Sequence, residues 1–399
     1  MRYEILNTKY QLQITNHQLP KIPKTYIKKI MKLSNRSLAL DVFRGMTVCF
    51  MIIVNTSGNW GTTFAPLLHA QWNGFTPTDL VFPAFLFAVG NSMSFVMDKW
   101  KKMSQQQVLT KIFKRTFIIF LLGYLMYWFP FYNVDADFNL KSFPFVETRF
   151  LGVLQRIALC YGLASLILYY FKPKFSLYLS AIILLGYWLV FIGYGPYDMQ
   201  HNPVLDLDLQ LFGESHLYHG EGFAFDPEGF LSTFPGLVNV FAGYFAGKFI
   251  QEKGRSYEGI AQLLLVGFIL IAGGFLWNYG FAINKKLWTS SYVLLTIGLS
   301  ISILALIFYY TDFVQQKKGV YFFEVFGKNT LAIYLLSELI VPLMWRVPIA
   351  GQASYTWIYE NLFTPFGAYF GAFLFSFVYM LLCWSVGYLL DKKKIYIKI

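Results

Sequence analysis

The chain has 399 residues, of which 56% are hydrophobic, 20% aromatic and 14% charged, and its formal net charge is +12. Soluble domains carry more charge and fewer apolar residues, so this composition excludes an ordinary water-soluble protein and indicates a membrane protein. The apolar runs are continuous rather than alternating, which excludes a membrane β-barrel.

Ten largely apolar stretches follow one another along the chain, and each is long enough to cross a hydrocarbon core of about 30 Å. We therefore predict an all-α polytopic membrane protein with about ten transmembrane helices. The expected spans lie near residues 39–56, 79–98, 114–131, 149–171, 175–195, 230–250, 258–277, 290–310, 321–344 and 365–390.

Basic residues concentrate in every second loop of this arrangement. With the N-terminus inside, the expected outer loops carry only Lys141, Lys285, Lys286 and Arg346, and the remaining loop lysines and arginines fall inside. The positive-inside rule then places both termini in the cytoplasm. We interpret the basic excess as a topology signal and an attraction to anionic lipid, and we expect no nucleic acid as a partner.

Three regions are expected: a basic cytoplasmic tail over 1–38, a transmembrane domain over 39–390 and a basic cytoplasmic tail over 391–399. Residues 1–38 lack the apolar core of a cleaved signal peptide, so the first span must act as the insertion signal. Lys24, Lys28 and Lys32 recur every four residues, which suits a short basic helix on the inner membrane surface. A disordered tail explains the pattern equally well.

The first span contains Asp41 and Arg44, three residues apart on one helix face. They form either a local ion pair or an anion site in which Arg44 binds phosphate. Asn55 ends this span on the side of the following loop, so we favour a chemical role for it. Asn91 and Asn239 lie in later spans, where a buried amide commonly hydrogen-bonds between helices.

The loop after the first span contains a histidine at the expected membrane boundary, in the segment His69-Ala-Gln-Trp72-Asn73. The ordinary pKa of histidine lies near neutrality, so His69 could act as a general base or carry an acyl group. Asp79 begins the next helix, where a carboxylate is favoured. Trp72 suits a membrane interface or a sugar face. The alternative is that His69 is an ordinary polar residue on the protein surface.

Later spans contain further charges, which usually face a protein interior or a wet cavity. Arg149 and Arg156 are seven residues apart and are expected on one face of the fourth span. Arg156 has no carboxylate close by in the chain, so it needs a partner from another helix or a bound anion. Glu324 and Lys328 have the spacing of an intrahelical pair.

The long outer loop at 196–229 contains seven acidic residues and no Lys or Arg. Its histidines, His201, His216 and His219, match no compact metal-ligand spacing, so we expect no metal. We predict a solvated acidic loop, without an obvious helix, that closes over a polar substrate. The chain's cysteines, Cys49, Cys160 and Cys383, all fall within spans and are expected to behave as small apolar residues.

These motifs resemble the transmembrane heparan-α-glucosaminide N-acetyltransferases, and their bacterial relatives in amino-sugar metabolism look closer still. The resemblance covers most of residues 36–390. The large extra-membrane N-terminal domain of the animal enzyme has no counterpart in this sequence. This difference favours a small amino sugar as the substrate. The resemblance is carried by Asp41-Val-Phe-Arg-Gly45, Val54-Asn55, His69-Ala-Gln-Trp-Asn-Gly74, Asp79-Leu-Val-Phe-Pro83, Gly152-Val-Leu-Gln-Arg156, Asp226-Pro-Glu-Gly229 and Asn284-Lys-Lys-Leu-Trp-Thr289.

The resemblance implies acetyl transfer from cytoplasmic acetyl-CoA to the amino group of glucosamine, or of a glucosamine-containing saccharide, on the periplasmic side of a bacterial inner membrane. It also implies a catalytic His69, with Asn55 beside it, and a possible homodimer. We infer that Asp79 orients the histidine or holds the amine. Our candidates for the acetyl-CoA side are Arg44, Arg156, Lys328, Asn91 and Asn239, and those for the sugar are Trp72, Asn73, Asp226, Glu228 and Trp288.

Two alternatives stay open. An amino-sugar transporter would also have many spans and buried charges, although the sequence has no clear internal repeat of the kind such proteins often show. An acyltransferase could use another acyl group or an envelope-glycan acceptor. Within the acetyltransferase hypothesis, the acetyl group either rests on His69 or passes directly in a ternary complex.

Overall fold

Thirteen α-helices make up nearly all the regular structure in residues 38–253 and 256–397, the part of the chain that the computed structural model describes. Two short β-hairpins accompany them. The predicted all-α class is therefore confirmed. The basic helix predicted around Lys24–Lys32 lies outside the described residues.

Seven of the described helices are long and apolar enough to cross a membrane, which confirms a multi-pass membrane protein. They are α3 (Leu38–Asn55), η3 with α4 (Pro77–Leu80 and Val81–Trp100), α6 (Val153–Tyr170), α7 (Pro173–Tyr194), α10 (Tyr257–Trp277), α11 with the π-helical η6 (Ser290–Phe308 and Tyr309–Phe313) and α15 (Ala368–Lys392).

The other three expected spans are also helical, as α5 (Gln105–Trp128), α9 (Thr233–Lys253) and a broken ninth segment. The expectation of one continuous ninth helix was wrong. The segment divides into α12 (Val320–Lys328) and α13 (Thr330–Arg346), because Asn329 has a non-helical backbone at φ −126° and ψ 37°. The side chain of Asn329 bonds instead to the backbone of Ile395 and Ile397.

Two further expectations need correction. Helix α6 begins at Val153, so Arg149 precedes it and does not share a helix face with Arg156. The outer loop at 196–229 contains a helix, α8 (Pro203–Phe212). The Asn202 side chain caps α8 by accepting the backbone N–H of Leu205 at 2.9 Å, and proline occupies the favoured first helical position.

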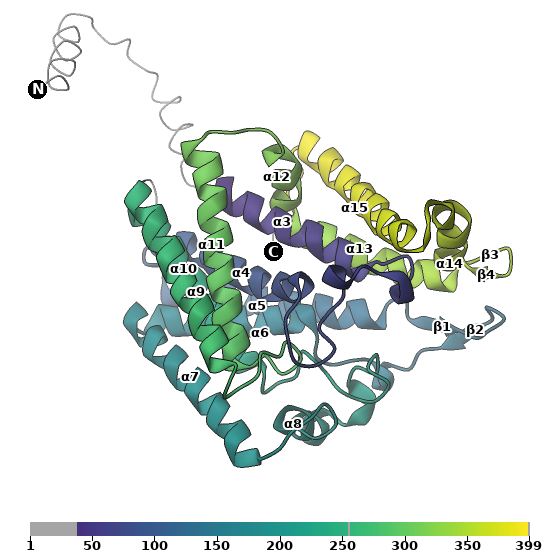
Figure 1. Ribbon diagram of the computed structural model, residues 1–399, viewed down its shortest axis with the longest axis horizontal. Coiled ribbons are helices and arrows are strands. Elements are labelled where there is room, and N and C mark those ends of the chain that lie inside the picture. The colour runs from purple at the N-terminus through teal and green to yellow at the C-terminus, as the bar shows by residue number, and fades with distance from the viewer. Residues whose placement is uncertain (1–37, 254–255, 398–399) are drawn as a thin grey trace, which may run out of the picture. The chain divides into compact units, whose positions relative to one another are not determined.

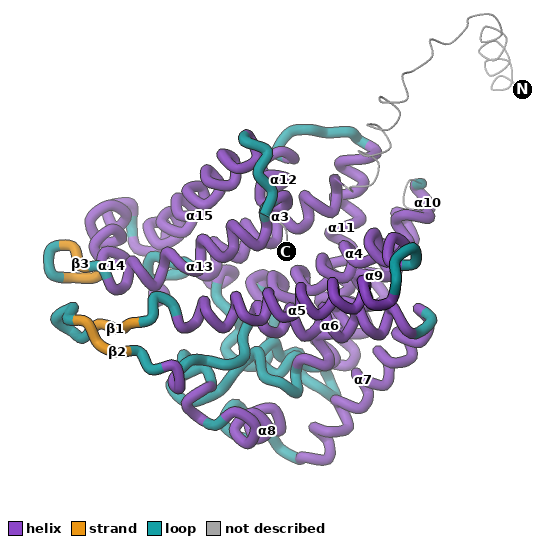
Figure 2. The backbone as a smooth tube through the Cα atoms, turned by 180° about the vertical axis from the view of Figure 1, so that it is seen from behind, coloured by secondary structure: helices purple, strands orange, loops and turns teal. Residues whose placement is uncertain are grey.

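Short elements connect the long helices. Figure 2 shows that most loop segments gather around α8, on one side of the helices. Strand β1 pairs with β2, and β3 pairs with β4, both antiparallel. The short elements are η1 (Trp60–Thr62), η2 (Ala65–Leu67), β1 (Tyr132–Val134), β2 (Leu140–Ser142), η4 (Phe145–Glu147), η5 (Glu214–His216), β3 (Pro348–Ile349), β4 (Gln352–Ala353), α14 (Ser354–Ile358), η7 (Tyr359–Phe363) and η8 (Thr364–Phe366).

Helices α4 and α9 lie side by side near the centre of the molecule (Figures 1 and 2). A Cβ atom on Gly90 would come within 1.8 Å of the Val240 carbonyl oxygen, and one on Gly243 within 1.9 Å of the Phe87 carbonyl oxygen. Glycine at both positions lets the two backbones approach closely, as is common between membrane helices. This pair gives the loop before α4, which contains His69, a rigid support.

Candidate functional site

His69 and Asp79 form a hydrogen-bonded pair at the start of the second membrane helix. Asp79 lies in η3, and its fully buried side chain uses Oδ2 to accept the backbone N–H groups of Thr76 (2.9 Å) and Ala70 (3.2 Å). Its other oxygen, Oδ1, lies 2.6 Å from His69 Nδ1. The Nδ1–H of a neutral imidazole therefore donates to Asp79, and the lone pair on Nε2 faces away from the carboxylate.

Lys285 completes this pair from the loop between α10 and α11. Its Nζ lies 3.1 Å from His69 Nε2. Two contacts between the loops fix this position: the backbone N–H of Gly74 donates to the Ile283 carbonyl at 2.8 Å, and the Asn284 amide donates to Asn73 Oδ1 at 3.2 Å. The three groups Asp79, His69 and Lys285, here called the Asp–His–Lys cluster, thus come from two loops far apart in sequence.

The electrostatics of the cluster favour the neutral form of the imidazole. Burial lowers the pKa of His69 below its ordinary value of 6.5, and the positive charge of Lys285 lowers it further, against the opposing effects of Asp79 and Glu228. Burial also lowers the pKa of Lys285. Because 42% of the His69 side chain is exposed, a neutral imidazole is available to a molecule arriving from outside the bundle.

Asp226 and Glu228, expected to bind the sugar, both bind Arg149. The Arg149 guanidinium donates to the two Asp226 oxygens at 2.8 and 2.6 Å and to Glu228 Oε2 at 2.6 Å. It also lies over the rings of Tyr127 and Tyr218, at 4.8 and 4.7 Å from their centroids. Burial raises the pKa of Glu228, but the positive charges of Arg149 and Lys285 outweigh it, so the pKa falls below its ordinary value.

The acidic loop is therefore docked rather than solvated. A second ion pair, between Lys286 Nζ and Glu221 Oε2 at 2.5 Å, joins it to the α10–α11 loop. The three histidines of the acidic loop contact separate groups: His201 contacts Asp198, His216 the Thr148 carbonyl and His219 the Leu217 carbonyl.

Arg156 of α6 is fully buried. Its guanidinium donates to the Gly229 carbonyl at 3.0 Å and to the Ser232 hydroxyl, and it lies 4.7 Å from the ring centroid of Trp288. Its Nε and Nη1 atoms have no hydrogen-bond partner within the described part of the chain. Arg156 was expected to need a partner from another segment. Its partners are the Gly229 carbonyl, the Ser232 hydroxyl and the Trp288 ring, and none of these is a carboxylate.

Trp288 and Asn239 hold one another inside the helix bundle. Both are fully buried, and the indole N–H of Trp288 donates to Asn239 Oδ1 at 3.1 Å. Asn239 in turn donates to Thr296 Oγ1 at 3.2 Å. Asn91 is buried on α4, close to Gly243 of α9. These amides lie between helices, the commoner position for such side chains.

Asn55 ends α3, as expected, and its side-chain amide donates to Glu338 Oε1 of α13 at 3.0 Å. The described hydrogen bonds include none between Asn55 and His69. Trp72 packs edge-on against Phe225 of the acidic loop, with ring centroids 6.3 Å apart.

Three further cations, Arg44, Arg115 and Lys328, lie on α3, α5 and α12. Arg44 pairs with Asp41, and Lys328 pairs with Glu324 at 2.9 Å, as the helical spacing predicts, and with Asp391 at 3.1 Å. Arg44 also lines a cavity of about 130 Å³ together with Arg115 of α5. Arg115, which stacks 4.7 Å from the Tyr161 ring centroid, was not among the residues expected from the sequence.

Lys285 is the main functional candidate that sequence reasoning missed. Two signals were present: it lies in a motif that carries the family resemblance, and it is one of the few basic residues on the expected outer side. Neither signal indicates which residue it contacts.

Comparison with known proteins gives the family. An acyltransferase domain family matches residues 37–390. The heparan-alpha-glucosaminide N-acetyltransferase of Mus musculus is 28% identical over 375 residues, which cover 79% of this chain and 55% of that protein. The Homo sapiens protein of the same name is 27% identical over 380 residues, covering 80% and 56%. The chain thus spans about half the length of these relatives. Because the family match extends over most of its residues, the chain belongs to the acyltransferase domain family.

Proposed function

We propose that this membrane acyltransferase moves an acetyl group from acetyl-CoA to the amino group of glucosamine or of a glucosamine-containing saccharide. Family membership supports acyl transfer, and the names of the two relatives suggest the acetyl donor and the glucosaminide acceptor. The observation that carries the proposal is the Asp–His–Lys cluster, in which a neutral imidazole has its Nε2 atom 3.1 Å from a lysine ammonium.

The cluster can serve the reaction in a simple way. As the acceptor nitrogen attacks the thioester carbonyl, His69 Nε2 takes the amine proton, and the CoA thiolate leaves. Asp79 stabilises the imidazolium that forms. Lys285 Nζ, and a side-chain amide such as that of Asn55, are donors of the kind that stabilise the oxyanion.

The same atoms suit a two-step route. His69 Nε2 would attack the thioester first and expel the CoA thiolate. The acceptor amine would then take the acetyl group, and the released imidazole would take up the amine proton at Nε2. Both routes need the acceptor nitrogen to be uncharged when it attacks. The nearby carboxylates, Glu228 above all, provide negative charge that attracts an ammonium to the site.

We further propose ten membrane crossings, with α5, α9 and the α12–α13 pair added to the seven apolar helices, and with both termini in the cytoplasm of a bacterial cell. The Asp–His–Lys cluster then opens to the periplasm, and the cavity beside Arg44 and Arg115 lies toward the cytoplasm, where guanidinium groups suit the phosphates of CoA. Arg156, between these two levels, is our candidate for a contact with the donor.

The test uses purified protein in proteoliposomes with labelled acetyl-CoA and glucosamine. We expect N-acetylglucosamine to form, and His69→Ala to reduce turnover by about 10²–10⁴-fold, the usual contribution of a general base. His201→Ala is the matched control, because His201 is exposed and bonds only within its own turn; its turnover should equal that of the unmodified protein.

Full turnover by His69→Ala would exclude the proposed site. Uptake of glucosamine by the same vesicles without any acetyl donor would identify a transporter instead. A panel of acyl donors and glycan acceptors, tested with one preparation, separates the glucosamine enzyme from an acyltransferase of other specificity.

A further inference from the structure

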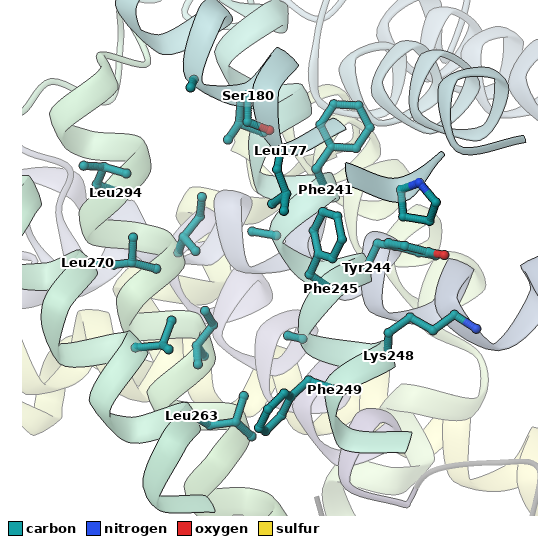
Figure 3. Close-up of a pocket in the computed structure, with 18 of the residues that line it drawn as sticks. Leu177, Ser180, Phe241, Tyr244, Phe245, Lys248, Phe249, Leu263, Leu270 and Leu294 are labelled. Atoms are coloured by element: carbon teal, nitrogen blue, oxygen red, sulfur yellow. The ribbon is translucent and has the colours of Figure 1, made fainter. Parts of the chain in front are cut away.

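A groove of about 930 Å³ lies between α7, α9, α10 and α11 (Figure 3). Its walls are mainly apolar, and the residues that line it include none of the Asp–His–Lys cluster. Its volume is at the upper end of the roughly 300–1,000 Å³ typical of small-molecule sites. The walls include Leu177, Phe241, Phe245, Leu263, Leu270 and Leu294.

The groove has charges at one end only. Asp98 and Lys101 lie at the end of α4, and Lys248 and Glu252 lie in the last turns of α9. Asp98 bonds to Lys248 at 2.6 Å and to Lys101 at 2.9 Å. Among the residues that line the groove, two lysines and two carboxylates thus form a charge-balanced polar end. This end is open to water, because 76% of the Lys101 side chain is exposed.

The opposite end of the groove is apolar, with Leu184 of α7, Val238 of α9 and Leu294 of α11. Between Val238 and Glu252, α9 rises about 21 Å, at 1.5 Å per residue. One leaflet contributes about 15 Å of hydrocarbon, with a headgroup layer outside it. The groove therefore matches the depth of a single leaflet, and it is too short for a membrane-spanning helix from another chain.

We propose that this groove is a binding site for one zwitterionic phospholipid that carries a phosphate and a primary amine. The acyl chains lie against the phenylalanine and leucine side chains. The phosphate binds at Lys101 and Lys248, whose ammonium groups also hold Asp98, and the amine binds beside Glu252. Balanced charges at the polar end favour such a headgroup over an anionic one, which would meet two carboxylates as well as two lysines. The proposal does not depend on the acetyl-transfer reaction.

The test compares lipid retained by the purified protein with lipid in the source membrane. The full chain is purified in a mild detergent, and its lipids are extracted and quantified by mass spectrometry. We expect phosphatidylethanolamine to be enriched over its share of the membrane, at one molecule per chain, and phosphatidylglycerol, the anionic probe, to be depleted.

Two neighbouring substitutions in α7 give a matched pair. Ala181 lines the groove, whereas Ile182 faces away from it with 66% of its surface exposed. Ala181→Trp should reduce retention about tenfold, because the ring excludes about two methylene groups of the acyl chain. Ile182→Trp should retain lipid as the unmodified chain does. Gel-filtration profiles check that both variants are folded.

Three results would overturn the proposal: retained lipid with the composition of the membrane, equal loss of lipid from both tryptophan variants, or stoichiometric displacement of the lipid by acetyl-CoA. The last would assign the groove to the acyl donor. Lys248→Gln tests the headgroup, and it should lower the enrichment of phosphatidylethanolamine without adding bulk to the groove.

Discussion

Asp79 orients His69 with one oxygen because its other oxygen is already occupied. The backbone N–H groups of Thr76 and Ala70 hold Oδ2, which leaves Oδ1 for the imidazole. A carboxylate fixed in this way selects both the tautomer and the ring orientation of its histidine. The other ring nitrogen, Nε2, lies 3.1 Å from the Lys285 ammonium nitrogen.

Replacing Lys285 should change the pH dependence of acetyl transfer. The positive charge of Lys285 disfavours the imidazolium and so lowers the pKa of His69. In Lys285→Met, that pKa rises, and the neutral imidazole is lost at a higher pH. We therefore expect the acidic limb of kcat/KM against pH to move upward by about one pH unit.

Lys286→Met is the control for this experiment. Lys286 is the next residue, but its ammonium pairs with Glu221 rather than with His69. Its removal should leave the midpoint of the acidic limb unchanged, even if total activity falls. An unshifted midpoint in Lys285→Met would show that the lysine does not act on the imidazole.

Asp79→Asn removes the negative charge of the side chain but keeps its size, so it tests whether the carboxylate orients the His69 ring. An amide cannot stabilise the imidazolium, and it permits the wrong tautomer. We expect kcat to fall by roughly 10²–10⁴-fold, the range for loss of a general base or of its orienting carboxylate. Asp206→Asn, which alters a half-buried carboxylate bonded to Tyr194, should have little effect. Equal turnover in the two variants would contradict the role given to Asp79.

The sequence predicts some of these contacts and not others. His69 and Asp79 are ten residues apart beside a helix start, so local reasoning could pair them. Lys285 reaches His69 through loop contacts such as Gly74–Ile283, which have no periodic pattern in the sequence. The charge of Arg156 within an apolar span suggested a bound anion. In the structure, part of the stabilisation of this charge comes from the Trp288 ring.

At the scale of the elements, the α4–α9 pair depends on glycine. A methyl group at Gly243 would overlap the Phe87 carbonyl, so Gly243→Ala must push the two helices apart. We expect a loss of about 1–3 kcal/mol in stability, the usual cost of overpacking. The apparent Tm in detergent measures it.

Gly186→Ala on α7 is the matched control, because no atom lies within 4 Å of its added methyl group. There the substitution should leave the Tm unchanged or raise it slightly, since alanine favours a helix. If Gly243→Ala and Gly186→Ala lowered the Tm equally, Gly243 would not be needed for the close approach of α4 and α9.

Hydropathy predicted where most helices lie but not all of their ends. Asn55 was placed correctly, because polar residues follow it at once. The start of α6 was placed too early, because the apolar residues Phe150 and Leu151 come before Val153 with only Gly152 between them. Helix α8 was missed because two aspartates interrupt its apolar residues, although Asn202 and Pro203 are ordinary start signals.

At the scale of the whole molecule, the chain separates its charges between the two ends of the helices. Lysines cluster around the α4–α5 turn, whereas the α8 side holds the acidic loop and the Asp–His–Lys cluster. Under the proposed function, a membrane around this molecule keeps the phosphates of the acyl donor and the sugar acceptor on opposite faces. The sequence predicts this sidedness through its basic residues, but hydropathy does not describe the side-chain packing through which the proposed acetyl transfer would pass.

Cysteine labelling tests the orientation. Cys49, Cys160 and Cys383 are buried, so background reaction should be low. A membrane-impermeant maleimide should label Leu140→Cys, in the exposed β1–β2 hairpin, in intact cells. It should label Lys102→Cys, in the α4–α5 turn, only after the membrane is permeabilised. The reverse pattern would place the Asp–His–Lys cluster in the cytoplasm.

The distance in sequence between His69 and Lys285, 216 residues, decides when during synthesis the Asp–His–Lys cluster can assemble. The ribosome releases His69 early, and its loop then waits while six long helices are made. Only when α10 and α11 are inserted does the lysine arrive between them. A nascent chain that ends before α10 therefore has no complete Asp–His–Lys cluster, however well its helices insert.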